Sequence, residues 1–197
     1  MYKRQAPPLE QLEAIWSKSV EEQAKGWLSP FLSEWELDDH FGEGLWRALM
    51  RFALWQHDKW RLIDDASVGH NDTYGSSETI HTTSAAAAAA LTKRLRDKVG
   101  APLKGPWRII AWSRDMKSAY KQLCIHPDQI RYCVIAFFDP HRGVWVFAIS
   151  YALAFGLAGA VLHFNRIPAL IVAFCRRWMA IPVQNFYDDL ESLNPLP

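Results

Sequence analysis

The chain has 197 residues, which is enough for one large domain or two small ones. Half of the residues are hydrophobic and ten are tryptophans, which allows a sizeable core and argues against disorder. The formal net charge is +1, from 22 basic and 21 acidic side chains, so charge alone does not indicate a nucleic-acid binder and any basic patch must be local.

The first half of the sequence predicts mainly helices. Residues 8–25 and 41–57 each carry apolar side chains at helical spacing. The run DKWRLIDDAS at residues 58–67 predicts a strand followed by a turn, and residues 66–77 are turn-forming residues typical of a loop. Residues 78–98 contain six consecutive alanines and end in basic side chains, which favours a third helix.

We expect Gly100 and Pro102 to end this third helix. From Trp107 onward the pattern changes to strands separated by helical segments. The predicted elements are strands at residues 106–115, 130–139, 143–151 and 181–190, a helical turn at 115–123, a tight turn at Pro140–Gly143, and a helix at Gly156–Met179 with a break near Pro168. This order, β-α-β-β-α-β, is that of a ferredoxin-like fold, so the predicted fold class is α+β.

The three cysteines predict neither a disulfide framework nor a zinc site. Their number is odd and their spacing is scattered. Cys124, His126, Cys133 and His141 cluster in the sequence, but their spacing matches no standard zinc module. We interpret the cysteines, which include Cys175, as reduced intracellular thiols. The N-terminus lacks the apolar segment of a secretory signal, so we expect an intracellular protein.

One apolar stretch requires a test for membrane insertion. Residues Val144–Leu162 are uncharged and long enough to span a bilayer. The first part, VWVFAISY, is β-branched and aromatic, as strands are, whereas AFGLAGAV is typical of a loop that enters a helix. We therefore expect no membrane span, and a small membrane protein is kept as an alternative.

Three aspartates lie at the ends of predicted strands. Asp115 ends RIIAWSRD, and Asp188 and Asp189 end VQNFYDD. In a β-α-β-β-α-β sheet the first and last strands can be neighbours, which would bring the three carboxylates together. Clustered carboxylates repel one another unless cations lie between them, and Mg²⁺ prefers oxygen ligands. Taken singly, an aspartate after a strand is usually a cap or a turn residue, and an Asp-Asp pair is usually a solvated turn, so only the combination of the three indicates a metal site.

Four motifs in a fixed order then give a resemblance to a family. They are Lys59-Trp60-Arg61 with Ile63-Asp64, Asp115-Met-Lys-Ser-Ala-Tyr120, Phe155-Gly156-Leu157 followed by Ala160, Phe164 and Arg166, and Phe186-Tyr187-Asp188-Asp189. This set resembles the fingers strand, the first palm motif, the motif under template and nucleotide, and the aromatic-x-Asp-Asp hairpin of reverse transcriptases. The likeness covers residues 55–190.

The resemblance implies an RNA-directed DNA polymerase of retrotransposon type. Its catalytic residues would be Asp115, Asp188 and Asp189, which would bind two Mg²⁺ ions, with Mn²⁺ as an alternative. Asp115 and Asp188 would be the principal ligands and Asp189 a less direct one. Two such ions can activate a 3′-hydroxyl and stabilise leaving pyrophosphate. The implied partners are an RNA or DNA template with its primer, and deoxynucleoside triphosphates (dNTPs).

The resemblance also implies five nucleotide-binding residues. Tyr120 would be a steric gate whose ring fills the space of a ribose 2′-hydroxyl, and Phe155 and Gly156 would lie against the nucleotide. Arg61 would bind the triphosphate through its planar fork, and Lys59 would add a point charge. The alternatives are a core tyrosine, a strand-to-helix turn at Gly156 and a solvated basic pair.

The chain also departs from the family pattern. Val161 stands where many relatives have proline, and Asp65 follows Asp64 where an aromatic residue is frequent, which indicates a divergent branch. Only eight residues follow Asp189, whereas the family continues with a returning strand, further palm and a thumb. The sequence therefore predicts a ferredoxin-like palm truncated before the thumb, and assigns the activity to an intact parent protein.

The predicted organisation is an N-terminal helical extension at residues 1–54, a fingers-like segment at 55–106 and an incomplete palm at 107–197. The sequence leaves two alternative functions open beside the polymerase. One is an inactive remnant or RNA-binding module, which the length suggests. The other is the membrane protein spanning Val144–Leu162.

Overall fold

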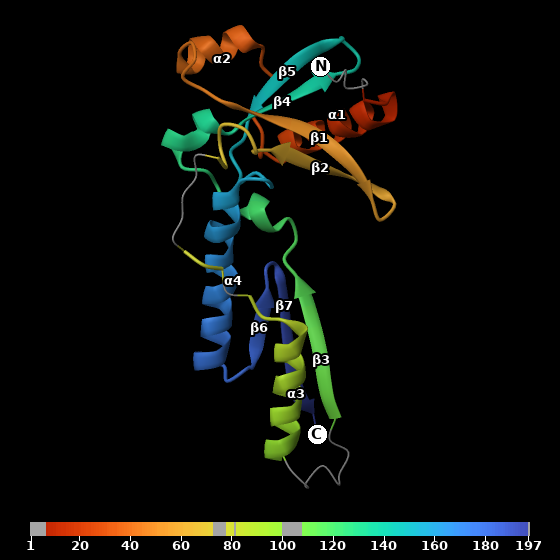
Figure 1. Ribbon diagram of the computed structural model, residues 1–197, viewed down its shortest axis with the longest axis vertical. Helices are drawn as coiled ribbons and strands as arrows, with labels where there is room; N and C mark the ends of the chain where they lie inside the picture. Colours follow the sequence, from red (N-terminus) through yellow and green to blue (C-terminus); the bar gives the residue numbers. More distant parts are fainter. Residues whose placement is uncertain (1–6, 73–77, 81, 100–107, 197) are drawn as a thin grey trace. The chain divides into compact units, whose positions relative to one another are not determined.

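The computed structural model describes residues 7–72, 78–80, 82–99 and 108–196, and its class is α+β, as predicted. Two compact units form the chain, and Figure 1 labels their elements. The first unit combines Met1–Gly75 with Tyr120–Val161, and the second combines Ser76–Ala119 with Leu162–Pro197. Each unit is therefore built from two separate stretches of sequence. The predicted segments 1–54, 55–106 and 107–197 rest on the resemblance and stay predictions.

The first unit contains a four-stranded sheet. Its elements are α1 (Leu9–Ala24), α2 (Glu34–Phe41), β1 (Ala48–Gln56), β2 (Lys59–Asp65), η3 (Pro127–Tyr132), β4 (Val134–Asp139) and β5 (Val144–Ile149), and the short helix η2 (Ala119–Gln122) begins at its boundary. The strand order is β2-β1-β4-β5, in which only β1 and β4 are parallel. The predicted hairpin of β4 and β5 is confirmed, and the Asp139 carboxylate accepts backbone N–H bonds from His141 and Arg142 in its turn.

Helix α1 packs on this sheet along one face, as Figure 1 shows. Ile15 is buried, and the Trp16 ring meets Phe31 edge-on at 5.2 Å between centroids. Polar side chains of the helix also bind strand carbonyls: Gln11 donates to Ala53 at 2.6 Å, and Lys18 donates to the carbonyl of Trp60. The predicted helix at residues 8–25 is thus confirmed as α1.

The predicted helix at residues 41–57 is wrong, because most of that segment is strand β1. Leu49, Arg51 and Ala53 are buried, at a spacing of two residues, whereas Met50 and Leu54 are exposed. A short apolar run can satisfy the helical and the strand period at once. Pairing with β2 on one side and β4 on the other decides in favour of the strand.

The second unit contains a three-stranded antiparallel sheet with the order β3-β7-β6. Its elements are α3 (Ala85–Val99), β3 (Arg108–Asp115), most of α4 (Ala158–Trp178), β6 (Val183–Phe186) and β7 (Asp189–Leu196). Helix α3 lies along β7 in Figure 1. Strand β7 is the returning strand of a hairpin, formed by the residues that follow Asp188.

Three sequence expectations need correction in this part of the chain. The single β-α-β-β-α-β sheet is not formed, because β4 and β5 pair with β1 and β2 while β3 pairs with β7. Helix α3 begins at Ala85 rather than at residue 78, since the preceding Thr83 donates from its backbone and its hydroxyl to the carbonyl of Asn185. Helix α4 continues through the buried Pro168 without the expected break.

Four of the expectations fall on undescribed positions. Gly100, Pro102, Trp107 and residues 73–77 of the predicted loop lie outside the described residues.

The predicted membrane alternative at Val144–Leu162 does not form one helix, because β5 occupies its first part and α4 begins only at Ala158. Among the described residues, α4 itself has the length and composition needed to cross a membrane, with a mean hydropathy of 1.5 in a window that is 28% buried. The core helices of soluble proteins can share these properties, so they do not by themselves assign α4 to a bilayer.

Candidate functional site

The β6–β7 hairpin carries two of the three predicted metal ligands. Phe186 and Asp189 are the last paired residues, so Tyr187 and Asp188 form a two-residue connection. Tyr187 has a φ of +54°, a left-handed conformation that a residue with a side chain adopts at some cost. Tight hairpins use a positive φ at this place because it matches the twist of the two strands. The turn therefore holds Asp188 at the tip of the hairpin.

Strand β3 brings the third aspartate to the same end of the sheet. Asp115 is directly opposite Asp189 in the antiparallel register of β3 and β7. One residue further on, the backbone N–H of Met116 donates to the carbonyl of Asp188 at 3.0 Å. The backbones of Asp115, Asp188 and Asp189 thus meet at one end of the three-stranded sheet, although the neighbour of β3 is β7 rather than the predicted β6.

The side chains of these aspartates are accessible. Asp115 is exposed, and Asp188 and Asp189 are half-buried. Within the described ranges, no group of three His, Cys, Asp or Glu residues is arranged so that it could hold a metal ion. The donor set fits Mg²⁺ in its chemistry, since all three groups are hard carboxylate oxygens. Negative charges without a cation repel one another, which favours separated side chains.

An aromatic pair in the first unit joins two of the predicted nucleotide-binding residues. The rings of Tyr120 and Phe155 meet edge-on with 5.5 Å between centroids. Tyr120 is half-buried, whereas 57% of Phe155 is exposed. The structure therefore brings these two predicted residues together and leaves more than half of the surface of Phe155 exposed.

Gly156 has a structural requirement of its own. Its φ is +137°, and a Cβ atom at this position would lie 2.1 Å from the carbonyl oxygen of Asp64. Asn71 fixes the same loop: its side-chain amide donates to the carbonyl of Gly156 at 2.8 Å and its side-chain oxygen accepts from the backbone N–H of Ala158 at 2.8 Å. Close packing against the end of β2 thus explains the glycine without a nucleotide.

The two predicted triphosphate-binding residues share one face of β2. Lys59 and Arg61 are exposed, while Trp60 and Leu62, which alternate with them, pack against the core. Successive residues of a strand point to opposite faces of its sheet, so Lys59 and Arg61 share a face. The arrangement places both cations in solvent, where they are available to an anion and equally compatible with a solvated basic pair.

Sequence reasoning missed a buried ion network around Arg51. Its guanidinium donates to both carboxylate oxygens of Asp64, at 2.7 and 3.2 Å, and to the hydroxyl of Ser19 at 3.0 Å. Glu22 adds a carboxylate 2.9 Å from Arg51 and 3.4 Å from the ammonium group of Lys121. Burial alone would lower the pKa of Arg51, but the charges of Asp64 and Glu22 raise it on balance.

The signal that could have identified this network was the spacing of residues 49–53. Read as a strand, LMRFA places Arg51 on the same face as two apolar residues, which a basic side chain tolerates only with acidic partners. Asn71 carried no comparable signal, because its partners lie more than 80 positions away in the sequence.

The register of the strands brings the backbones of the three aspartates together, although their side chains, which the structure describes, do not form a ready-made metal cluster. Tyr120 and Phe155 form a partly exposed aromatic pair. These two groups belong to different units of the chain. A comparison with protein-family models finds no match, and a comparison with curated proteins finds none either.

Proposed function

We propose that this chain is the fingers and palm part of a reverse-transcriptase-type polymerase, in which the second unit carries the catalytic carboxylates. The observation that supports the proposal is the register of β3 and β7, which sets Asp115 opposite Asp189 with Asp188 next to it. The residues come from motifs 73 positions apart, and their meeting at one strand end is what shared cation binding requires.

Each carboxylate has an assigned role in this proposal. Asp115 and Asp188 bind the two cations directly, and Asp189 helps to orient them. The chemistry supplied by two bound Mg²⁺ ions is activation of the primer 3′-hydroxyl and stabilisation of the departing pyrophosphate. Asp115 is exposed and Asp188 and Asp189 are only half-buried, so in this proposal a change of rotamer brings their carboxylates to a shared ion.

Residues of the first unit supply nucleotide recognition in the same proposal. Phe155 offers an exposed ring, and Tyr120 beside it is the steric gate that favours dNTPs. Lys59 and Arg61 bind the triphosphate from the exposed face of β2. Gly156 keeps its packing role against Asp64 whether or not a nucleotide lies nearby.

The proposal is tested first by metal binding, which does not depend on a complete polymerase. The measurement is the affinity for Mn²⁺, determined by electron paramagnetic resonance. We expect the full chain to bind Mn²⁺, and the Asp188→Asn variant to bind it at least tenfold more weakly. Asp128→Asn is the matched control, because its side chain is 89% exposed and lies outside the proposed site. Equal affinity in both variants would contradict the metal site.

Primer extension on a homopolymer RNA template with Mg²⁺ and dNTPs tests the chemistry. Incorporation that disappears in Asp188→Asn and persists in Asp128→Asn would support the polymerase. The second candidate function is an RNA-binding module without chemistry, which is favoured by the lack of a ready-made metal cluster among the described residues. RNA binding without metal binding or incorporation would select this second candidate.

A further inference from the structure

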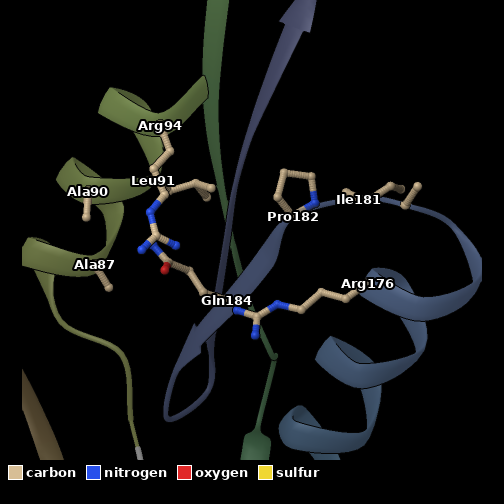
Figure 2. Close-up of a pocket in the computed structure, with 9 residues that line it drawn as sticks. Ala87, Ala90, Leu91, Arg94, Arg176, Ile181, Pro182 and Gln184 are labelled. Carbon is tan, nitrogen blue, oxygen red and sulfur yellow. The ribbon is translucent and has the colours of Figure 1, made fainter. Parts of the chain in front are cut away.

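The second unit contains a groove that none of the roles assigned above uses. It has a volume of about 660 Å³ and lies between α3, the end of α4 and β6. Figure 2 shows the side chains that line it. The lining residues are Ala87, Ala90, Leu91, Arg94, Arg176, Ala180, Ile181, Pro182 and Gln184. The volume is in the range of ligand-binding clefts, and the lining is small or apolar apart from two arginines and one amide.

The two arginines come from opposite walls. In Figure 2 Arg94 extends from α3 and Arg176 from α4, and both point toward Gln184 of β6. The Nε atom of Arg176 donates to the carbonyl of Val183 at 2.7 Å, which fixes the side chain across the link from α4 to β6. This bond uses one of its five donors. The groove therefore presents two guanidinium groups that are held by different elements.

The charged side chains that line the groove have one sign. None of its lining residues is acidic. The charged neighbours of Arg94 on α3 are mixed, with Lys93, Arg96 and Lys98 basic and Asp97 acidic. A smaller cavity of about 320 Å³ shares Gln184 but is lined by Glu191. Two cations in a groove whose lining has no carboxylate make the groove favourable for an anionic ligand.

We propose that this groove binds the phosphodiester backbone of a single-stranded nucleic acid, with Arg94 and Arg176 each contacting a phosphate. Guanidinium forks match phosphate oxygens, and alanines leave room for the sugar-phosphate chain to lie close to helix α3. The choice of nucleic acid over an acidic peptide rests on the proposed polymerase function. The groove residues are separate from the three aspartates. The proposal for the groove and the proposal for the metal site can therefore be contradicted independently of each other.

The first experiment compares two matched pairs of variants. Arg94→Gln removes a groove cation, whereas Arg96→Gln removes a cation of the same helix that lies outside the groove lining. Ala90→Glu adds a negative charge in the groove, and Ala89→Glu adds one next to it on α3 but outside the lining. All four positions are exposed on the helix, so none of the variants disturbs a core.

The measurement is fluorescence anisotropy of a labelled twelve-nucleotide oligo(dT) or oligo(U) with the full chain at several salt concentrations. We expect Arg94→Gln and Ala90→Glu to weaken binding about tenfold, and Arg96→Gln and Ala89→Glu to change it less than about twofold. The slope of log affinity against log salt should fall by about 0.7 in Arg94→Gln, the value for one lost single-strand phosphate contact.

Arg176→Gln tests the opposite wall of the groove, and Arg176→Lys, which keeps the charge but loses the fork, should retain part of the affinity. Thermal melting checks that both variants are folded. Equal losses in groove and control variants would overturn the proposal in favour of diffuse attraction. A labelled poly-glutamate peptide that binds as tightly, with the same dependence on Arg94, would overturn it in favour of an acidic peptide.

The outcome for the proposed function is separate. Asp188→Asn should leave oligonucleotide binding unchanged even if it abolishes metal binding. Loss of metal binding with normal groove binding therefore concerns the aspartates alone, and loss of groove binding with normal metal binding concerns the arginines alone.

Discussion

At the scale of single residues, Gly156 shows how the backbone limits what a position accepts. Its φ of +137° is open almost only to glycine, and an added Cβ would lie 2.1 Å from the Asp64 carbonyl oxygen. We expect Gly156→Ala to lower the free energy of unfolding by about 2–4 kcal/mol, because the strain and the clash add. Urea denaturation followed by circular dichroism measures this loss.

Gly143→Ala is the matched control for this prediction. Gly143 also has a positive φ, +69°, but a Cβ added there, in the β4–β5 turn, would meet nothing within 4 Å. Its substitution should cost only about 1 kcal/mol, the cost of the left-handed conformation. Equal losses for the two variants would show that packing against Asp64 does not constrain Gly156.

Cys133 provides a prediction that depends on pH. Burial, and secondarily the negative charge of Asp64, raise the pKa of this thiol to about 11 from an ordinary value of 9.0. Only the thiolate reacts with alkylating reagents, so at pH 8 a pKa two units higher leaves about a hundredfold less reactive species. We expect Cys133 to react with iodoacetamide at least a hundredfold more slowly than exposed Cys124, and faster as the pH rises toward 11.

Mass spectrometry of the alkylated peptides gives both rates from one sample. In urea the two cysteines should react at similar rates, because unfolding removes the burial that raises the pKa of Cys133. Rapid labelling of Cys133 at pH 8 in the native chain would contradict its burial next to β4.

The sequence predicts those residues whose role is indicated by their immediate neighbours in the chain. Asp188 and Asp189 carry a signal in their own motif, and the structure places Asp115 opposite Asp189. The roles of Arg51 and Gly156 depend on Asp64, which is 13 or more positions away from each of them in the sequence. Such partners become visible only when strands pair, which no local pattern specifies.

At the scale of elements, the sequence predicts a helix or strand correctly where its apolar residues follow only one of the two periods, helical or strand. The helices α1 and α4 and the β4–β5 hairpin follow from their own residues. The sequence of strand β1 predicts a helix because its apolar residues fit both the helical and the strand period, and pairing with β2 and β4 decides for the strand. The division of strands between two sheets is likewise set by pairing partners rather than by element order.

The pairing of β3 with β7 is the element-scale feature on which the candidate metal site depends. Ser113 and Glu191 are directly opposite in this ladder, two positions from the Asp115–Asp189 pair. Directly paired Cα atoms in an antiparallel sheet lie about 4.5–5.5 Å apart, which a disulfide can bridge. We therefore expect Ser113→Cys with Glu191→Cys to form a disulfide under mild oxidation, detected as a linked peptide by mass spectrometry.

Ser113→Cys combined with Ser192→Cys is the control, because Ser192 is opposite Trp112 and its side chain points to the other face of the sheet. This control pair should not link. A shift of the register by one residue would reverse the two results, since it moves every side chain of β7 to the opposite face, and would remove Asp189 from its place opposite Asp115.

At the scale of the whole molecule, both units are assembled from stretches on either side of residue 118. In the first unit β1 precedes this point and its partner β4 follows it, and in the second unit β3 precedes it and β7 follows it. Lys117 and Ser118 are exposed, and Ser118 has a positive φ of +59°. A break between these two residues would therefore divide both sheets without removing a buried side chain.

We expect neither fragment, residues 1–117 or 118–197, to unfold cooperatively on its own. The first would keep β1, β2 and β3, and the second would keep β4, β5, β6 and β7, so the β1–β4 and β3–β7 pairings would both be lost. Buried apolar faces would be exposed in each fragment, which favours aggregation or partial unfolding. Urea denaturation and size-exclusion chromatography of the separate fragments measure this.

Co-expression of the two fragments should restore a single folded species, because the paired strands supply each other's hydrogen bonds and cover the same apolar surface without a covalent link. The expected result is co-elution with a cooperative transition, somewhat less stable than the intact chain because two chains must associate. A fragment of residues 118–197 that folded cooperatively alone would contradict the assignment of its strands to two sheets completed by the N-terminal half.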